Sequence, residues 1–168
     1  MMAAREQLKK KAYRAWFIVA LIAAVWALAT VLPAILPHVS ETITGSSFFR
    51  FFGYICHQMP ERSFHIGVHQ FGVCSRCFGV YFGVAAGVLA YPLWRNVDEI
   101  EPLPRIWLFA SIIPMGIDWS MGMLGIWENN HLSRFVTGLI LGVGCSTYIV
   151  PAVVEITFNL SQSRRSAK

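Results

Sequence analysis

Four long apolar runs restrict what this chain can fold into. They are Phe17 to Leu36, Phe78 to Trp94, Ile106 to Trp127 and Phe135 to Phe158. A helix needs about 20 residues to cross the hydrocarbon core of a bilayer, so each run can span it. The only charged residues inside the runs are Asp118 and Glu155. We therefore expect an all-α, polytopic membrane protein, a single membrane domain over residues 1–168 with four transmembrane helices.

The overall composition excludes two other classes of protein. Apolar residues make up 55% of the chain and charged residues only 14%, with a mean hydropathy of +0.52. Disordered chains and most cytosolic enzymes are far less apolar.

The first apolar run also has features of a secretory signal peptide. Lys9, Lys10 and Lys11 precede it, and it contains the cleavage-like triplet Ala27-Leu28-Ala29. However, the run continues to Leu36, which is longer than a signal peptide requires. We expect it to be retained as a membrane span.

Lysine and arginine are distributed unevenly between the connections, and this predicts the orientation. Short cytoplasmic segments carry an excess of these residues. Four spans place both termini on one side, and ten of the fourteen basic residues lie there: Arg5, Lys9, Lys10, Lys11, Arg14, Arg95, Arg105, Arg164, Arg165 and Lys168. We expect a multi-pass protein of the cell (inner) membrane with both termini cytoplasmic. The net charge of +5 then suits contact with anionic lipid and requires no nucleic acid.

In this orientation the reactive side chains lie mostly on the outer face. The exofacial set comprises His38, His57, His65, His69, His131, Cys56, Cys74 and Cys77, whereas Cys145 lies within the last span. Most of the set belongs to the first outer loop, residues 37–76. A loop of that length usually has structure or function of its own.

Two segments of this loop have patterns of their own. Aromatic residues gather between Phe48 and Tyr54, which predicts an interfacial or re-entrant helix. Farther along, His65 and His69 would share one face if their segment were helical.

The cysteines of the loop predict a metal site. The motif CSRC at residues 74–77 supplies two thiolates from one turn, and a tetrahedral zinc site needs one or two further ligands. Cys56 offers a third thiolate, and the adjacent His57 is the best fourth ligand, ahead of His65 and His69. We expect Cys56, His57, Cys74 and Cys77 to bind zinc or another transition metal.

Other uses of the same cysteines stay open. In an oxidising compartment Cys56 would form a disulfide with Cys74 or Cys77. Alternatively, Cys74 and Cys77 form a redox-active pair, because Arg76 and a helix N-terminus would both stabilise a thiolate. The third option is that these are half-buried residues with no chemical role.

Small residues predict which helices pack together. Gly79, Gly83 and Gly87 recur every four residues in the second span, and Gly138 and Gly142 do so in the fourth. Such stripes let helices approach closely, so these two spans are expected to be partners. The cysteines fall on a different face of the second span, where they can border a cavity.

Asp118 marks a second candidate site, because a lone carboxylate inside a span costs about 3 kcal/mol. Arg76 and Arg134 begin neighbouring spans on the outer side, and either could pair with it. The pair could serve only to fix helix register. Alternatively, the three residues form a catalytic pocket that acts with the metal on a lipid-soluble or anionic small molecule. Cys145 lies about 16 Å deeper than Arg134, too far to join the metal shell.

Together these residues resemble the signature of a protein family. Its parts are Cys56-His57-Gln58, CSRCFGVYFG at 74–83, Pro114-Met115-Gly116-Ile117-Asp118, Asn129 or Asn130, and Arg134-Phe135-Val136-Thr137-Gly138. The combination resembles a family of small predicted integral membrane proteins of bacteria and archaea, over about residues 50–145. The resemblance implies a multi-span helical protein with one shared site and implies no particular activity. In that family a glycine usually follows the aspartate, where Trp119 stands here.

A looser resemblance is to the quinone-coupled thiol oxidases of the disulfide-forming pathway, which also have four spans and an outer CxxC. Those enzymes pass electrons through a second outer cysteine pair, whereas only Cys56 lies outside here besides residues 74–77. A membrane thiol-disulfide oxidoreductase with one pair therefore stays open. A small transporter and a structural membrane protein are the remaining alternatives.

Overall fold

We describe a computed structural model of the chain over residues 2–36 and 43–166. Within these ranges the elements in chain order are helices α1 (Met2–Ile35) and α3 (Ile43–Gly53), the 3-10 helix η1 (Pro60–Arg62), strands β1 (His65–Ile66) and β2 (His69–Gln70), and helices α4 (Ser75–Trp94), α5 (Ile106–Met123) and α6 (His131–Ser166). His38 of the predicted outer set and Lys168 of the basic tail lie outside the described residues.

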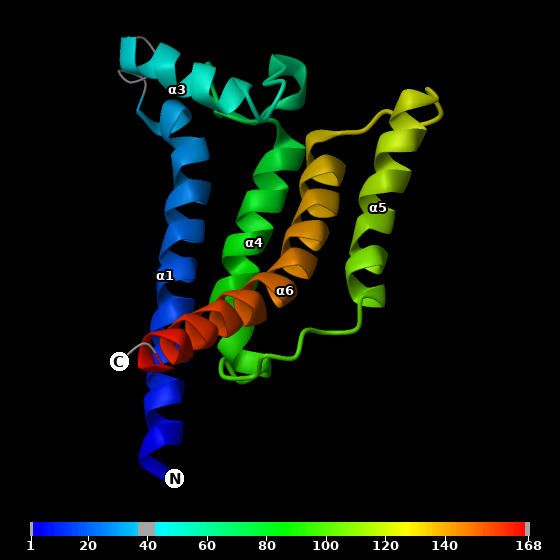
Figure 1. The fold of residues 1–168 in the computed structure, drawn as a ribbon. Helices are drawn as coiled ribbons and strands as arrows, with labels where there is room; N and C mark the ends of the chain where they lie inside the picture. The colour runs from blue at the N-terminus through cyan, green and yellow to red at the C-terminus, as the bar shows by residue number, and fades with distance from the viewer. Residues whose placement is uncertain (1, 37–42, 167–168) are drawn as a thin grey trace.

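Four of these helices are long and apolar enough to cross a membrane, as the sequence predicts: α1, α4, α5 and α6. Figure 1 shows α3 lying across the ends of α1 and α4 at one end of the bundle, while both chain termini lie toward the other end. The even number of candidate spans explains why the termini share an end. The predicted aromatic helix of the first outer loop is confirmed as α3.

Helices α1 and α6 are longer than the apolar runs that predicted them, whereas α5 is shorter than its run. It ends at Met123 and not at Trp127. Gly125 adopts a positive φ of 68°, a left-handed conformation that commonly ends a helix. Asp118 therefore lies only five residues, or about 8 Å, from the end of α5. The C-terminal end of α5 lies at the same end of the bundle as α3 (Figure 1).

The predicted pairing of the second and fourth spans is confirmed, because α4 and α6 form the most extensive helix contact of the described chain. A Cβ atom placed on Gly83 would overlap the backbone oxygen of Leu139, and one on Gly142 would overlap that of Val80. Glycine alone allows the two backbones to approach this closely.

A side-chain hydrogen bond joins α1 to α4 where a proline interrupts the helix. Pro92 lacks an N–H group, so it cannot donate to the backbone oxygen of Val88 four residues earlier. The indole N–H of Trp16 donates to that oxygen instead, at 2.7 Å. In a bilayer each unsatisfied carbonyl is costly, so this contact repairs α4 as well as fixing α1.

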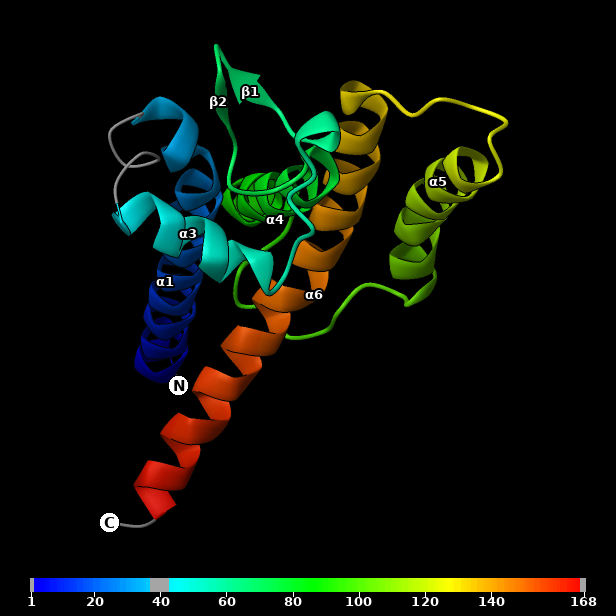
Figure 2. The same cartoon turned by 90° about the horizontal axis from the view of Figure 1, so that it is seen from above.

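The remaining helices pack around this pair in different ways. Beyond the buried Pro151, α6 turns toward α1 (Figure 1), and a core that includes Tyr91, Val150 and Val154 fills the space between α1, α4 and α6. In contrast, α5 packs on α6 and lies on the far side of it from α1 (Figure 2). Most of the α5 surface is left exposed to the surroundings.

The segment between α3 and α4 corrects one sequence expectation. His65 and His69 do not share a helix face, because the segment folds into the antiparallel pair β1 and β2, with His65 opposite Gln70. Gly67 takes a positive φ of 60° in the turn. Because the chain reverses at this turn, the four-residue spacing of His65 and His69 does not place them on one helix face.

Candidate functional site

Three cysteine sulfur atoms come together where α4 begins. Cys74 directly precedes α4, Cys77 lies in its first turn, and Cys56 follows α3. Their Sγ atoms lie within 4.8 Å of one another, and we call Cys56, Cys74 and Cys77 the cysteine cluster. The backbone N–H of Cys74 donates to Sγ of Cys56 at 3.2 Å. Each of these cysteines is a free thiol, as is Cys145, which lies outside the cluster as predicted.

The loop that carries Cys56 is held by backbone and amide hydrogen bonds. Gly72 donates its N–H to the backbone oxygen of Thr30 in α1 at 2.7 Å. Gln58 has a positive φ of 49°, and its side chain donates to the backbone oxygen of Gly72 at 2.7 Å. Gln70 in turn donates to the backbone oxygen of Gln58, also at 2.7 Å. This network brings the two ends of the loop together. The sequence analysis gave no structural role to Gln58 or Gln70.

Aromatic residues cover the cysteine cluster on one side. Phe52 and Cys56 are buried, and Trp26 of α1 contacts both Phe52 of α3 and Tyr81 of α4 through edge-to-face ring contacts. The apolar face of α3 therefore rests over the cluster and limits the access of water from that side. Tyr81 shares this environment with Cys77.

Sharing of protons within the cluster favours a thiolate at Cys74. Hydrogen bonding from the Cys56 thiol, and then from Cys77, holds the pKa of Cys74 far below its ordinary value. The contact with Cys74 raises the pKa of Cys56. Because the first turn of α4 also presents unpaired N–H groups and a positive helix end, a negative charge at Cys74 is well placed.

The predicted fourth ligand is positioned differently. His57 is exposed, and its ring nitrogens do not belong to the group of ligand atoms within 4.8 Å. It does line the cavity that the cysteine cluster faces. His57 is therefore near the sulfur atoms without being directed at them.

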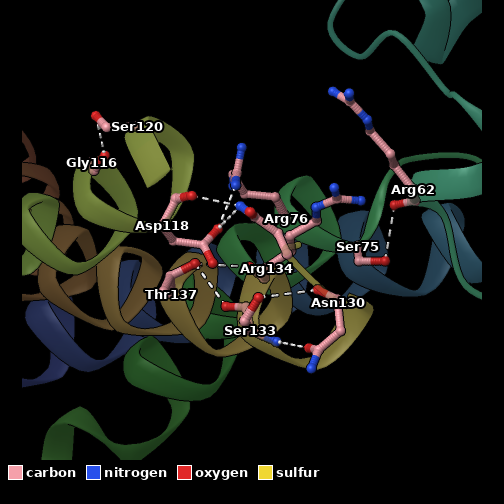
Figure 3. A network of polar contacts seen from close by, with 11 residues as sticks. Arg62, Ser75, Arg76, Gly116, Asp118, Ser120, Asn130, Ser133, Arg134 and Thr137 are labelled. Carbon is pink, nitrogen blue, oxygen red and sulfur yellow. Dashed lines mark hydrogen bonds and ion pairs between the residues drawn. The ribbon is translucent and has the colours of Figure 1, made fainter. Parts of the chain in front are cut away.

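Asp118 has a charged partner, as its place in a span requires. Nη2 of Arg76 lies 2.5 Å from Oδ2 of Asp118, and the two side chains are 22% and 8% exposed. Asn129 donates to the same carboxylate oxygen at 2.9 Å and to the backbone oxygen of Asp118 at 2.6 Å. Figure 3 shows Arg76 and Asp118 meeting between α4 and α5. The ion pair links the first turn of α4, which carries the cysteines, to α5.

Arg134 is the second predicted partner of Asp118, but its interactions differ from those of Arg76. Among the side chains that the structure describes, it forms no ion pair. It lines the same cavity as Arg76. Of the two predicted arginines, Arg76 is the one that pairs with Asp118.

A hydrogen-bonded serine connects the loop, α4 and α6. The hydroxyl of the fully buried Ser75 donates to the backbone oxygen of Arg62 at 3.0 Å and lies 2.9 Å from Nδ1 of His131. A hydroxyl has a single proton, so Nδ1 of His131 must be the donor in the second contact. Sequence analysis assigned no role to Ser75, although it lies inside the CSRC motif.

A large cavity opens beside the cysteine cluster. It has a volume of about 1060 Å³ and includes in its lining Cys56, His57, Arg62, Cys74, Arg76, Cys77, Trp127, Glu128, Asn129 and Arg134. A second, apolar groove of about 500 Å³ lies between α5 and α6, lined by Ile113, Pro114, Ile117, Asp118, Met121, Trp127 and Ser133. Trp127 borders both spaces, so they are neighbours.

Comparison with known proteins gives the family. The profile described as "Predicted membrane protein (DUF2085)" matches residues 56–148, more than half of the chain. The chain belongs to this family. The DUF2085 match begins at Cys56 and includes the whole cysteine cluster, Asp118 and Arg134. This confirms the family resemblance expected from the sequence.

Two relatives are archaeal proteins whose names assign no function. An uncharacterized protein of Methanocaldococcus jannaschii is 40% identical over 108 residues, which are 64% of this chain and 69% of that protein. An uncharacterized protein of Methanothermobacter thermautotrophicus is 39% identical over 95 residues, which are 55% of this chain and 82% of that protein. No solved structure matches the chain significantly.

Proposed function

We propose that this protein binds a transition metal, most simply zinc, at the outer face of the membrane through Cys56, Cys74 and Cys77. The observation that carries the proposal is the approach of three sulfur atoms to within 4.8 Å. Tetrahedral zinc holds thiolates at about 2.3 Å, which separates bound sulfurs by about 3.8 Å. Shifts of roughly 1 Å in the side chains are therefore sufficient to close the site around a metal.

The surroundings of the sulfur atoms also support metal binding. Metal ligands must be deprotonated, and hydrogen bonding from Cys56 and Cys77 already lowers the pKa of Cys74. The positive N-terminus of α4 acts in the same direction. The aromatic cover over the cluster limits exchange of a bound ion with water.

A third sulfur atom favours a metal over a thiol-redox pair. A redox pair uses two cysteines, and a disulfide between any two members would leave the third without a partner. A metal uses all three. We therefore rank a thiol-disulfide oxidoreductase second.

The fourth metal position is proposed to face the cavity. His57, which lines this cavity, is the proposed protein ligand there, and it must reorient its side chain to reach the metal. A position left open to water or substrate is the arrangement of catalytic metal sites. In that case Arg76 and Arg134 would stabilise negative charge on a substrate, and Asp118 would hold Arg76 in place.

Metal analysis of detergent-purified protein tests the proposal. We expect about one equivalent of zinc or iron by mass spectrometry, lost in Cys56→Ser and Cys77→Ser and retained in the matched control Cys145→Ser. The metal should also be released as the pH falls, because protons compete for the thiolates. Loss in His57→Ala would assign the fourth ligand. If the wild-type protein holds no metal and gains two thiols on reduction, the metal site is wrong and a disulfide takes its place.

A further inference from the structure

We propose that the cavity beside the cysteine cluster binds the phosphate headgroup of a membrane lipid whose hydrocarbon chain occupies the groove between α5 and α6. The inference deepens the proposed function. It rests on that function only for the presence of a metal in the same cavity. It names the class of molecule that this metal would meet.

Positively charged side chains gather at this site. Three arginines from three different elements line one cavity: Arg62 of η1, Arg76 of α4 and Arg134 of α6. The carboxylate of Asp118 is already engaged by Arg76. Glu61 and Glu128 also line the cavity and are exposed, as is Arg62, whereas Arg76 and Arg134 are partly buried. Arg134 thus lacks an ion-pair partner among the described side chains.

Further donors and charges at this place suit a phosphate. Nε of Arg76 is buried and has no hydrogen-bond partner in the described part of the chain. Guanidinium groups bind phosphate oxygens in pairs, with strong charge-assisted hydrogen bonds. The N-terminus of α4 borders the same cavity and adds backbone N–H groups that favour an anion. Figure 3 shows Arg62, Arg76 and Arg134 in one view, with Arg76 directed at Asp118.

The site lies near one end of the helix bundle. Arg76 and Arg134 lie in the first turns of α4 and α6, and Asp118 is about 8 Å from the end of α5. The arginines therefore lie near the end of the bundle, where the polar headgroups of a bilayer meet its hydrocarbon core. A lipid phosphate reaches this depth without leaving the membrane.

An apolar groove adjoins the cavity. It favours a lipid over a soluble phosphate as the ligand, because only a lipid has a hydrocarbon chain to fill it. Its lining is apolar except for Asp118 and Ser133, and it lies between the peripheral helix α5 and α6. Trp127 borders both the groove and the cavity, and the ion pair of Asp118 with Arg76 joins them. A hydrocarbon chain in the groove would therefore continue directly to a headgroup at the arginines.

Native mass spectrometry of the purified protein with three matched probes tests this inference. The probes are phosphatidic acid, diacylglycerol with the same chains but no phosphate, and glycerol phosphate with no chains. We expect phosphatidic acid to bind more tightly than either of the others, and binding to fall about tenfold in Arg134→Gln and in Arg62→Gln. Arg50→Gln, an exposed arginine of α3 at the same end of the molecule, is the matched control and should bind normally.

Two results would overturn the inference. Equal binding of phosphatidic acid and diacylglycerol would show that the phosphate is not recognised, and equal binding of glycerol phosphate would show that no chain is held. Metal content is measured in the same samples. Loss of the lipid with the metal retained, as expected for Arg134→Gln, separates this site from the cysteine cluster. If the wild-type protein binds the lipid but contains no metal, the proposed function fails and the lipid site stands.

Discussion

The contact between Arg76 and Asp118 shows how much one pair of side chains decides in this protein. The side chain of Asp118 is 8% exposed and lies near the C-terminal end of α5, where a lone carboxylate would be costly. Arg76 lies between Cys74 and Cys77 in sequence, so the same contact orients the turn that carries the cysteines. Helix α5, whose main helix contact is with α6, is thereby joined to α4.

We expect Asp118→Asn and Arg76→Gln each to destabilise the protein by about 3 kcal/mol, because each leaves the other charge buried without its partner. The double variant should lose clearly less than the sum of the two. Equilibrium unfolding in mixed micelles, arranged as a double-mutant cycle, measures this coupling. Purely additive losses would contradict a direct interaction between the two side chains.

At the level of helices, the pairing of α4 with α6 depends on glycine because backbone approaches backbone. A Cβ atom on Gly142 would lie 2.8 Å from the backbone nitrogen of Val84 and 2.9 Å from Cα of Gly83. None of these atoms can move without shifting a whole helix. The two first turns that carry Arg76 and Arg134 are held near each other by this contact.

Gly142→Ala should therefore destabilise the protein by about 1 to 3 kcal/mol, the usual range for overpacking. Gly116→Ala in α5 is the matched control, since a Cβ atom there meets nothing within 4 Å. Alanine has the higher helix propensity, so this control should be neutral or slightly stabilising. The same unfolding assay compares the two variants. Equal effects would mean that the close approach of α4 and α6 is not limiting.

For the whole molecule, the proposed orientation places the cysteine cluster outside and both termini in the cytoplasm. A fluorescent protein fused after Lys168 should fluoresce in cells, and alkaline phosphatase fused there should be inactive. At the other end, Val68 at the tip of the hairpin is 87% exposed. Val68→Cys should react with a membrane-impermeant maleimide added outside, beyond the labelling of the wild-type chain. An active phosphatase fusion would reverse the orientation.

The number of candidate spans and the pairing of α4 with α6 follow from the sequence. Hydrophobic length and small-residue spacing are local properties, and a bilayer responds to them wherever the chain goes. The sequence also singled out Cys56, Cys74 and Cys77, because their types and positions are chemically unusual. The ends of the helices were harder to predict from the sequence, because a single left-handed residue such as Gly125 can end a helix within an apolar run.

Which of these residues come into contact depends on the tertiary structure. Cys56 reaches α4 because the backbone of Gly72 is tied to Thr30 and the amide of Gln58 closes the loop, and no spacing rule encodes such contacts between distant segments. The choice of Arg76 over Arg134 as the partner of Asp118 likewise depends on how three helices are placed. Distances between side chains from separate helices follow from packing, and packing is a property of the assembled bundle.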